Sequence, residues 1–226
     1  MTNFRTFILG LAASFGLPWL CLIVLPAMKY EQLAPVAYDK EKDGVEGYFP
    51  PAPINGQGQL VYISEGCNQC HTQMIRPVQL GLDGWYRGWG QDQEARPEKP
   101  ARPNVLADYL GEKYALLGIQ RVGPDLANFG WRAPDAATLH LHLYAPRAVH
   151  DWSTMPAYKN LYKVQKQQGP ASKQALKLPK QFAPEAGYEV VPTKEAEQLV
   201  EYLQSLKKDY PVPGQGAAVA ASPAKK

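Results

Sequence analysis

Residues 6–28, TFILGLAASFGLPWLCLIVLPAM, contain no charged side chain, and this stretch constrains the fold more than any other feature of the sequence. As an α-helix rising about 1.5 Å per residue it spans about 34 Å, which is enough to cross the hydrocarbon core of a bilayer. A helix also satisfies its own backbone hydrogen bonds where water is absent. The sequence therefore predicts a transmembrane anchor over residues 1–29, with Pro18 as a candidate kink.

A cleaved signal peptide is the alternative interpretation of this stretch. Signal peptides usually have an apolar segment of about 7–15 residues, followed by a cleavage site of small residues. Here the apolar run is longer, a single basic residue, Arg5, precedes it, and no clear cleavage site follows it. We therefore expect a retained, single-pass anchor. The flanking charges of Arg5 and Lys29 are too balanced to orient this anchor.

The rest of the chain is rich in residues that interrupt regular structure. The 226 residues include 21 prolines and 19 glycines, which predicts long loops between few long elements. The elements that can be identified are helices, so we expect a mostly α-helical fold. Apolar residues at helical spacing predict one short helix from Gly58 into the segment before residue 71, and a second helix over residues 193–208. Thr193 is placed to cap this second helix.

These patterns divide the chain into an anchor, an arm, a domain and a tail. Pro-, Gly- and Lys-rich stretches without periodicity predict loops or insertions inside the domain, with one short helix in the segment 104–117. We expect an extended arm over 30–57, a domain over 58–209 with insertions at about 81–120 and 159–190, and a disordered tail over 210–226.

The charge balance argues against a nucleic-acid partner. The chain has 24 Lys and Arg residues against 21 Asp and Glu residues, a net charge of +3. The two signs are interspersed along most of the sequence, and nucleic-acid binding domains usually have a strongly basic face. We therefore expect no nucleic acid among the partners.

Two of the three cysteines, Cys67 and Cys70, lie in the sequence EGCNQCHTQMIRP, with His71 directly behind them. This Cys-x-x-Cys-His pattern is the attachment signature of c-type haem. The two thiols bond to the two vinyl groups of the porphyrin, and the adjacent histidine becomes an axial ligand of the iron. The motif therefore predicts one covalently bound haem c. The third cysteine, Cys21, lies in the apolar run and is expected to act as a small hydrophobic residue.

A redox dithiol and a structural zinc site are the two alternatives for this motif. A thioredoxin-like dithiol requires a preceding strand and an alternating pattern of strands and helices, which the sequence lacks. A structural zinc site requires four ligands, usually as two pairs, and there is no second cysteine pair. Both alternatives therefore fit less well than haem attachment.

An axial methionine or histidine is expected on the other side of the haem iron. The candidates are Met74, Met155, His140, His142 and His150. Met74 lies only three residues beyond His71, too close along the chain to reach the opposite face of the ring. Met155 lies in DWSTMPAYKN, where Pro156 favours a loop. We therefore expect Met155 to be the second ligand, in a site with His71.

Other residues near these motifs are expected to support the haem. Gly123 and Pro124 can form a tight turn whose carbonyl accepts the imidazole N–H of the proximal histidine and fixes the orientation of its ring. Guanidinium groups are suitable partners for haem propionates, and the sequence offers Arg76, Arg132 and Arg147 without favouring one of them.

The order of these motifs resembles that of class I cytochromes c. Gly58 and Tyr62 precede the Cys-x-x-Cys-His motif, GPDL follows at 123–126, STMP at 153–156, and a final helix contains LVEYLQSLK. More narrowly, EGCNQCHTQMIRP after a single N-terminal apolar helix resembles the mono-haem subunit (subunit II, CcoO/FixO type) of cbb3-type cytochrome c oxidases.

This resemblance implies a class I cytochrome c domain whose haem is held by Cys67, Cys70, His71 and Met155. It implies an electron-transfer subunit with no active site of its own. The implied partners are a large polytopic haem–copper oxidase subunit and a further c-type cytochrome subunit or a soluble cytochrome c. The implied location is the bacterial inner membrane, with the N-terminus in the cytoplasm and the haem domain in the periplasm.

Two other functions stay open from the sequence. The chain fits a free-standing, membrane-anchored cytochrome c that shuttles electrons between respiratory complexes. It also fits, less well, a thiol or metal protein without haem.

Overall fold

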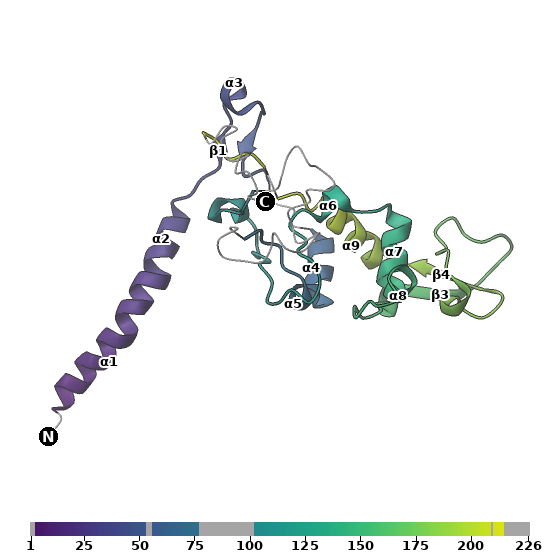
Figure 1. The fold of residues 1–226 in the computed structure, drawn as a ribbon, viewed down its shortest axis with the longest axis horizontal. Coiled ribbons are helices and arrows are strands. Elements are labelled where there is room, and N and C mark those ends of the chain that lie inside the picture. Colours follow the sequence, from purple (N-terminus) through teal and green to yellow (C-terminus); the bar gives the residue numbers. More distant parts are fainter. Residues whose placement is uncertain (1–2, 53–55, 77–101, 209, 215–226) are drawn as a thin grey trace, which may run out of the picture.

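The computed structural model describes residues 3–52, 56–76, 102–208 and 210–214. Figure 1 shows a long N-terminal helix that extends away from a small helical domain, with a β-hairpin at the opposite end of the molecule. The predicted disordered tail from residue 215 onward and the part of the predicted 81–120 insertion before residue 102 lie outside the described residues.

The N-terminal helix runs from Phe4 to Glu31 without interruption, as the uncharged stretch predicts. It consists of α1 (Phe4–Trp19), a π-helical turn (Leu20–Val24) and α2 (Leu25–Glu31). The mean hydropathy of its most apolar 18-residue window is 2.3, and none of that window is buried inside the structure. The helix is therefore long and apolar enough to cross a membrane. The π-helical turn begins two residues after Pro18, which removes one backbone N–H from the helix.

The segment after this helix contains three short elements that the sequence does not predict. Strand β1 (Val36–Ala37) pairs antiparallel with β2 (Tyr48–Phe49), and α3 (Lys40–Asp43) lies between them. The hydroxyl of Tyr30, at the end of α2, donates to the carbonyl of Tyr109 in the domain at 3.0 Å. The hydroxyl of Tyr38 in the segment donates to the carbonyl of Pro211, just beyond the domain, at 2.8 Å.

The core of the domain forms where α4 (Gln57–Ser64) crosses α9 (Lys194–Ser205). At the crossing a Cβ atom on Gly58 would overlap the carbonyl oxygen of Gln198 and lie 2.7 Å from Cβ of Tyr202. The rings of Tyr62 and Tyr202 lie 5.5 Å apart between the two helices. Only glycine at position 58 therefore allows the two backbones to approach this closely.

The structure confirms the prediction for α9, both in its N-cap and in the face that it buries. The side chain of Thr193 accepts a hydrogen bond from the backbone N–H of Ala196, as expected for an N-cap. Every apolar position at helical spacing is buried, namely Ala196, Leu199, Val200, Leu203 and Leu206. The amphipathic pattern of this segment was therefore sufficient to identify both the helix and the side that packs on the core.

The remaining helices are short, and prolines or polar caps bound several of them. Asp135 caps α7 by accepting from Thr138, and Pro146 opens α8 at a position where its missing N–H costs nothing. The remaining short helices of the described residues are α5 (Cys67–Cys70), α6 (Phe129–Arg132), α7 (Ala136–Tyr144) and α8 (Pro146–Val149). Three 3₁₀ turns accompany them, at Leu106–Tyr109, Lys159–Leu161 and Lys180–Phe182. The turn at Leu106–Tyr109 lies where a short helix was expected.

The stretch 159–190, predicted to be an insertion or a loop, contains most of a β-hairpin. Strand β3 (Tyr162–Lys166) pairs antiparallel with β4 (Tyr188–Pro192), in a register that runs from Tyr162 opposite Pro192 to Lys166 opposite Tyr188. Val190 and Tyr162 belong to the domain core. The loop prediction was wrong at both ends because strand pairing joins segments more than 20 residues apart, and lysines and prolines between them obscure the alternating pattern.

The close crossing of α4 and α9 predicts an effect of added volume. Gly58→Ala is expected to lower the free energy of unfolding by about 1–3 kcal/mol, because the backbones must separate to admit the methyl group. Urea unfolding of the detergent-solubilised full chain, followed by circular dichroism, measures this change. Gly56→Ala is the control, since a Cβ there meets no atom within 4 Å. Equal unfolding midpoints for the two variants would contradict the crossing.

Candidate haem site

A cavity of about 530 Å³ opens beside the Cys-x-x-Cys-His motif. Most of its lining comes from four parts of the chain: the end of α5, the segment 122–126, α7, and the loop between α8 and residue 158. Phe129 of α6 and Leu203 of α9 also line it. Its lining includes Cys70, His71, Leu126, Leu139, Leu143 and Met155. A largely apolar cavity of this size with a few polar groups is typical of a binding site for a cofactor.

The two cysteines of the motif lie on α5, directly after a turn that glycine makes possible. Gly66 has φ +72°, a conformation that other residues rarely adopt, and it redirects the chain between α4 and α5. Cys67 is buried, and burial raises the pKa of its thiol to about 11. A nucleophilic redox dithiol requires a lowered pKa, so the environment of Cys67 argues against that alternative.

His71 is oriented by the turn at residues 123–124, as the sequence predicts. Its Nδ1 lies 2.8 Å from the carbonyl oxygen of Pro124, and burial lowers the pKa of the imidazole. A carbonyl can only accept, so the Nδ1 atom of the neutral ring is the donor. The other nitrogen, Nε2, then has its lone pair free to bind a metal.

Gly123 lies against the imidazole ring and leaves no room for a side chain. A Cβ atom on Gly123 would overlap Cε1 of His71 and lie 2.8 Å from its Nδ1 and 2.9 Å from its Nε2. The backbone N–H of Gly123 also donates to the carbonyl of Cys70 at 3.0 Å. The glycine therefore forms a cradle that holds the ring between the motif and the turn.

Met155 lies on a loop that several hydrogen bonds hold against the domain. Its backbone N–H donates to the hydroxyl of Ser153 at 3.2 Å, and Nε of Arg147 donates to the carbonyl of Ser153 at the same distance. The side chain packs against the core and lines the same cavity as His71. Met155 and His71 therefore line one cavity.

The other candidate ligands divide into two groups. His142 and His150 also line the cavity, with their rings 5.8 Å apart. Met74 and His140 are not among its described lining residues. The backbone of Met74 donates to Asp125 at 2.9 Å, and Nδ1 of His140 lies 3.1 Å from the hydroxyl of Tyr162.

A buried network behind the motif, which the sequence analysis missed, fixes the chain directly after His71. The hydroxyl of Thr72 donates to Oδ2 of Asp125 at 2.5 Å, and the backbone of Ala127 donates to Oδ1 at 2.8 Å. Nε of Arg121 donates to the hydroxyl of Thr72 at 2.7 Å, and its Nη2 lies 3.5 Å from Oδ2 of Asp125. Burial raises the pKa of Asp125, and these hydrogen bonds and the guanidinium of Arg121 oppose that effect in part.

Gln73 connects this network to the final helix. Its side-chain amide donates to the hydroxyl of Tyr202 at 3.1 Å, and the hydroxyl of Tyr109 donates to its backbone carbonyl at 2.9 Å. The signal available in the sequence was the polar pair Thr72 and Gln73 directly after the motif, but its partners lie about 30 to 130 residues further along the chain.

The arginines suggested as propionate partners have other roles in the described structure. Arg132 donates from Nη2 to the carbonyl of Asp125 at 2.5 Å, and Arg147 holds the loop of Met155. None of the three arginines, Arg76 included, is among the described residues that line the cavity. The structure therefore does not place any of the three arginines at the candidate site.

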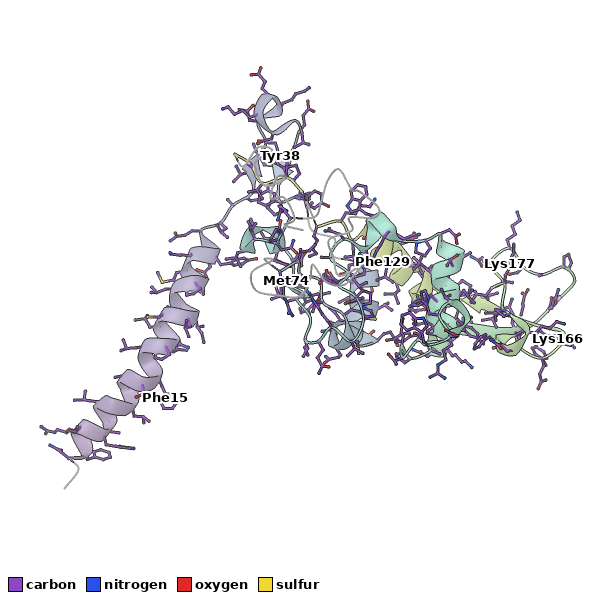
Figure 2. All side chains as sticks on the ribbon, in the orientation of Figure 1. Phe15, Tyr38, Met74, Phe129, Lys166 and Lys177 are labelled. Atoms are coloured by element: carbon purple, nitrogen blue, oxygen red, sulfur yellow. The ribbon has the colours of Figure 1, made fainter. Side chains whose placement is uncertain are left out.

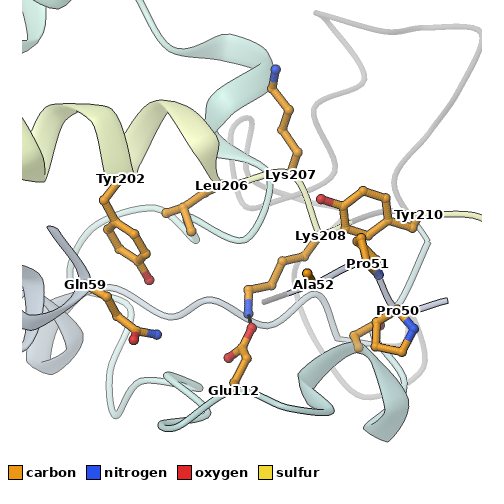
Figure 3. A pocket seen from close by; sticks show the side chains of 11 residues that line it. Pro50, Pro51, Ala52, Gln59, Glu112, Tyr202, Leu206, Lys207, Lys208 and Tyr210 are labelled. Carbon is orange, nitrogen blue, oxygen red and sulfur yellow. Dashed lines mark hydrogen bonds and ion pairs between the residues drawn. The ribbon is translucent and has the colours of Figure 1, made fainter. Parts of the chain in front are cut away.

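A second cavity, shown in Figure 3, is too small for a cofactor. Its volume is about 40 Å³, room for one or a few water molecules. Pro50, Pro51 and Tyr202 line it, and Lys208 pairs there with Glu112. This cavity lies where the end of α9 contacts the segment after β2.

The donor set of the large cavity fits haem better than a metal ion held by side chains alone. Among the described residues, no three His, Cys, Asp or Glu side chains gather as a metal site. The cavity instead combines Cys70 and an oriented His71 with apolar walls and a thioether. Imidazole and thioether groups are common axial ligands of haem iron.

A small, mostly helical fold with an apolar cavity beside an oriented histidine fits a haem-binding protein. The sequence pattern of one family, described as the mono-haem subunit of cytochrome c oxidase (FixO), matches residues 13–209. The chain therefore belongs to this family of cytochrome c oxidase subunits, which indicates one haem and a role in electron transport within an oxidase complex. Among curated proteins, no sequence matches the chain significantly.

The cradle around His71 predicts a strong effect of a single methyl group. Gly123→Ala is expected to lower the affinity of the site for haem about tenfold, because the methyl group displaces the imidazole ring. The haem content per purified chain, from the pyridine haemochrome spectrum, measures this loss. Gly56→Ala again serves as the control at an open position. Wild-type haem content and an unchanged Soret spectrum in Gly123→Ala would contradict the proposed role of the turn.

Proposed function

We propose that this protein holds one haem c through thioether bonds to Cys67 and Cys70, with His71 and Met155 as the axial iron ligands. In this role it passes electrons to the haem–copper subunit of a cbb3-type terminal oxidase. The observation that most supports the proposal is that His71 and Met155 line one apolar cavity, with His71 oriented by the carbonyl of Pro124. The family match supports the assignment of the protein to a cytochrome c oxidase.

When bound, haem supplies a reversible one-electron couple, and the residues of the chain determine how that couple behaves. Pro124 keeps the proton on Nδ1 of His71 and makes the imidazole a better electron donor through Nε2. Leu126, Leu139 and Leu143 exclude water from the cavity. A thioether ligand such as Met155 favours the reduced form more than a second histidine does, which suits transfer to an oxidising acceptor.

The properties of the N-terminal helix support the proposal that it anchors the protein in the bacterial inner membrane. None of its described apolar side chains is buried, so a lipid environment is the simplest way to cover them. Haem c is attached outside the cytoplasm, and this places the haem domain in the periplasm and the N-terminus in the cytoplasm. The proposed division is an anchor over 1–29, an arm over 30–57 and a cytochrome domain over 58–209.

The proposed partners are the large polytopic haem–copper subunit and a further c-type cytochrome subunit or a soluble cytochrome c. Affinity purification of the tagged chain from mild-detergent extracts is expected to bring down a many-helix haem–copper subunit in equal amount. Purification of the haem-containing chain alone would instead support a free-standing cytochrome that shuttles electrons between complexes.

Covalent attachment gives the first test of the haem site. Acid–acetone extraction is expected to leave the haem on the wild-type chain, because thioether bonds survive conditions that release non-covalent haem. Cys67→Ser/Cys70→Ser should retain no haem after extraction, whereas Cys21→Ser, the control, should retain the wild-type amount. Complete release of haem from the wild-type chain would overturn the proposal.

The second axial ligand is tested separately. Met155→Ala is expected to abolish the weak near-infrared charge-transfer band of methionine-ligated ferric haem and to lower the reduction potential. Met74→Ala is the matched control and should keep the band, since Met74 is not among the described residues lining the cavity. A band that persists in Met155→Ala and disappears in Met74→Ala would reverse the assignment.

A further inference from the structure

The positive charge of this chain is concentrated in one segment, the hairpin region at residues 159–192. This region contains six lysines and only two acidic residues, Glu185 and Glu189. The other 192 residues contain 18 basic and 19 acidic residues, so they are close to neutral. The whole net charge of +3 therefore comes from the hairpin region.

All six lysines are exposed, and Lys163 is close enough to Glu195 to help lower the pKa of that carboxyl group. Five of the six have neither a carboxylate oxygen within 4 Å nor an aromatic ring beneath the amine among the described residues. They are Lys163, Lys166, Lys173, Lys177 and Lys180. The sixth, Lys159, lies over the ring of Tyr144 at 5.7 Å. The carboxylate of Glu189 accepts from the side chain of Gln165 at 2.7 Å and from the backbone of Ser172 at 2.8 Å, so it is used inside the hairpin. The lysine charges are thus available to a partner.

The lysines lie on a hairpin whose connecting loop packs against the core and is hydrogen-bonded to the strands. In the loop between the strands, Leu176, Leu178 and Phe182 pack against the core while the lysines between them face outward. The backbone of Leu176 donates to the carbonyl of Val190 at 2.8 Å, and that of Gln167 to Gly187 at the same distance. The loop is therefore fastened to the strands, which lowers the entropy cost of binding.

Protection of sheet edges explains only part of this pattern. Lysines on an edge strand discourage pairing with other strands, and Lys163 and Lys166 on β3 fit that role. Lys173 and Lys177 lie outside both strands, and Lys180 lies in a 3₁₀ turn. These three lysines need another explanation.

We propose that this lysine hairpin, residues 159–192, is a docking surface for a protein with an acidic cleft. Figure 2 shows Lys166 and Lys177 on opposite sides of the hairpin, which itself projects from the domain. An acidic cleft contacts both sides of such a projection at once, whereas a flat lipid surface contacts one side. Complementary charge speeds association and selects the partner.

The hairpin is connected directly to the wall of the large cavity. Tyr158 lines that cavity, and the hairpin begins with the next residue. The hydroxyl of Tyr162 on β3 also donates to the carbonyl of His140 on α7 at 3.1 Å. A protein docked on the lysine hairpin would therefore lie beside the cytochrome site. The docking proposal itself does not depend on haem being present.

Zero-length crosslinking in native membranes tests the proposal with the partner that exists there. A carbodiimide joins a lysine amine to a carboxylate only when the two are in direct contact. Tandem mass spectrometry is expected to find Lys166 and Lys177 joined to Asp or Glu residues of one other protein. Crosslinks from the hairpin lysines only to this chain, or to none, would overturn the proposal.

Charge reversal supplies the matched control. Lys166→Glu/Lys177→Glu is expected to reduce the crosslinks of the remaining hairpin lysines about tenfold, because like charges then face each other. Lys40→Glu/Lys42→Glu makes the same change in net charge on α3, where both lysines are exposed, and should leave the yield unchanged. Equal losses in both variants would show a non-specific charge effect and overturn the proposal.

A lipid partner is tested in the same variants. The full chain is placed in neutral phosphatidylcholine nanodiscs and mixed with vesicles that contain phosphatidylglycerol. We expect the hairpin lysines to make no contribution to vesicle binding. Vesicle binding that Lys166→Glu/Lys177→Glu abolishes and Lys40→Glu/Lys42→Glu preserves would assign the surface to lipid instead of protein. Haem content, measured on the same samples, reports separately on the proposed function, so failure of one proposal is distinguishable from failure of the other.

Discussion

The buried carboxylate of Asp125 is the constraint on which the candidate site depends. It accepts hydrogen bonds from the hydroxyl of Thr72 and from the backbone of Met74 and Ala127. These bonds join the segment directly after His71 to the segment directly after Pro124, so the imidazole and the carbonyl that orients it are held side by side. These hydrogen bonds offset part of the cost of burying the carboxylate, although burial still raises the pKa of Asp125.

The same network ties the site to the core of the domain. Gln73 lies between the hydroxyl groups of Tyr109 and Tyr202, and the ring of Tyr202 packs at a tilt against that of Tyr62 where α4 crosses α9. Helix α4 leads directly into the cysteine motif. The rigidity of the helix pair therefore extends to the ligand, and fixed orientation of an axial histidine is one of the means by which a protein tunes a metal site.

Local patterns predicted a large part of the fold. The uncharged run identified the N-terminal helix, and the spacing of apolar residues identified α9 with its cap at Thr193. The hairpin at β3 and β4 escaped prediction because its strands pair across a long, lysine-rich loop. The partners of Thr72 and Gln73 escaped it for the same reason, since they lie far along the chain and no local spacing links them.

The sequence by itself determined the cysteine motif and the apolar helix, because attachment chemistry needs only local spacing and a membrane span needs only length without charge. The tertiary structure alone decided which distant groups meet. It brought Met155, His142 and His150 to the cavity of His71, turned Met74 and His140 to other partners, and gathered the lysines on a projecting hairpin. These outcomes depend on packing and on hydrogen bonds between residues far apart in the chain, which no local pattern specifies.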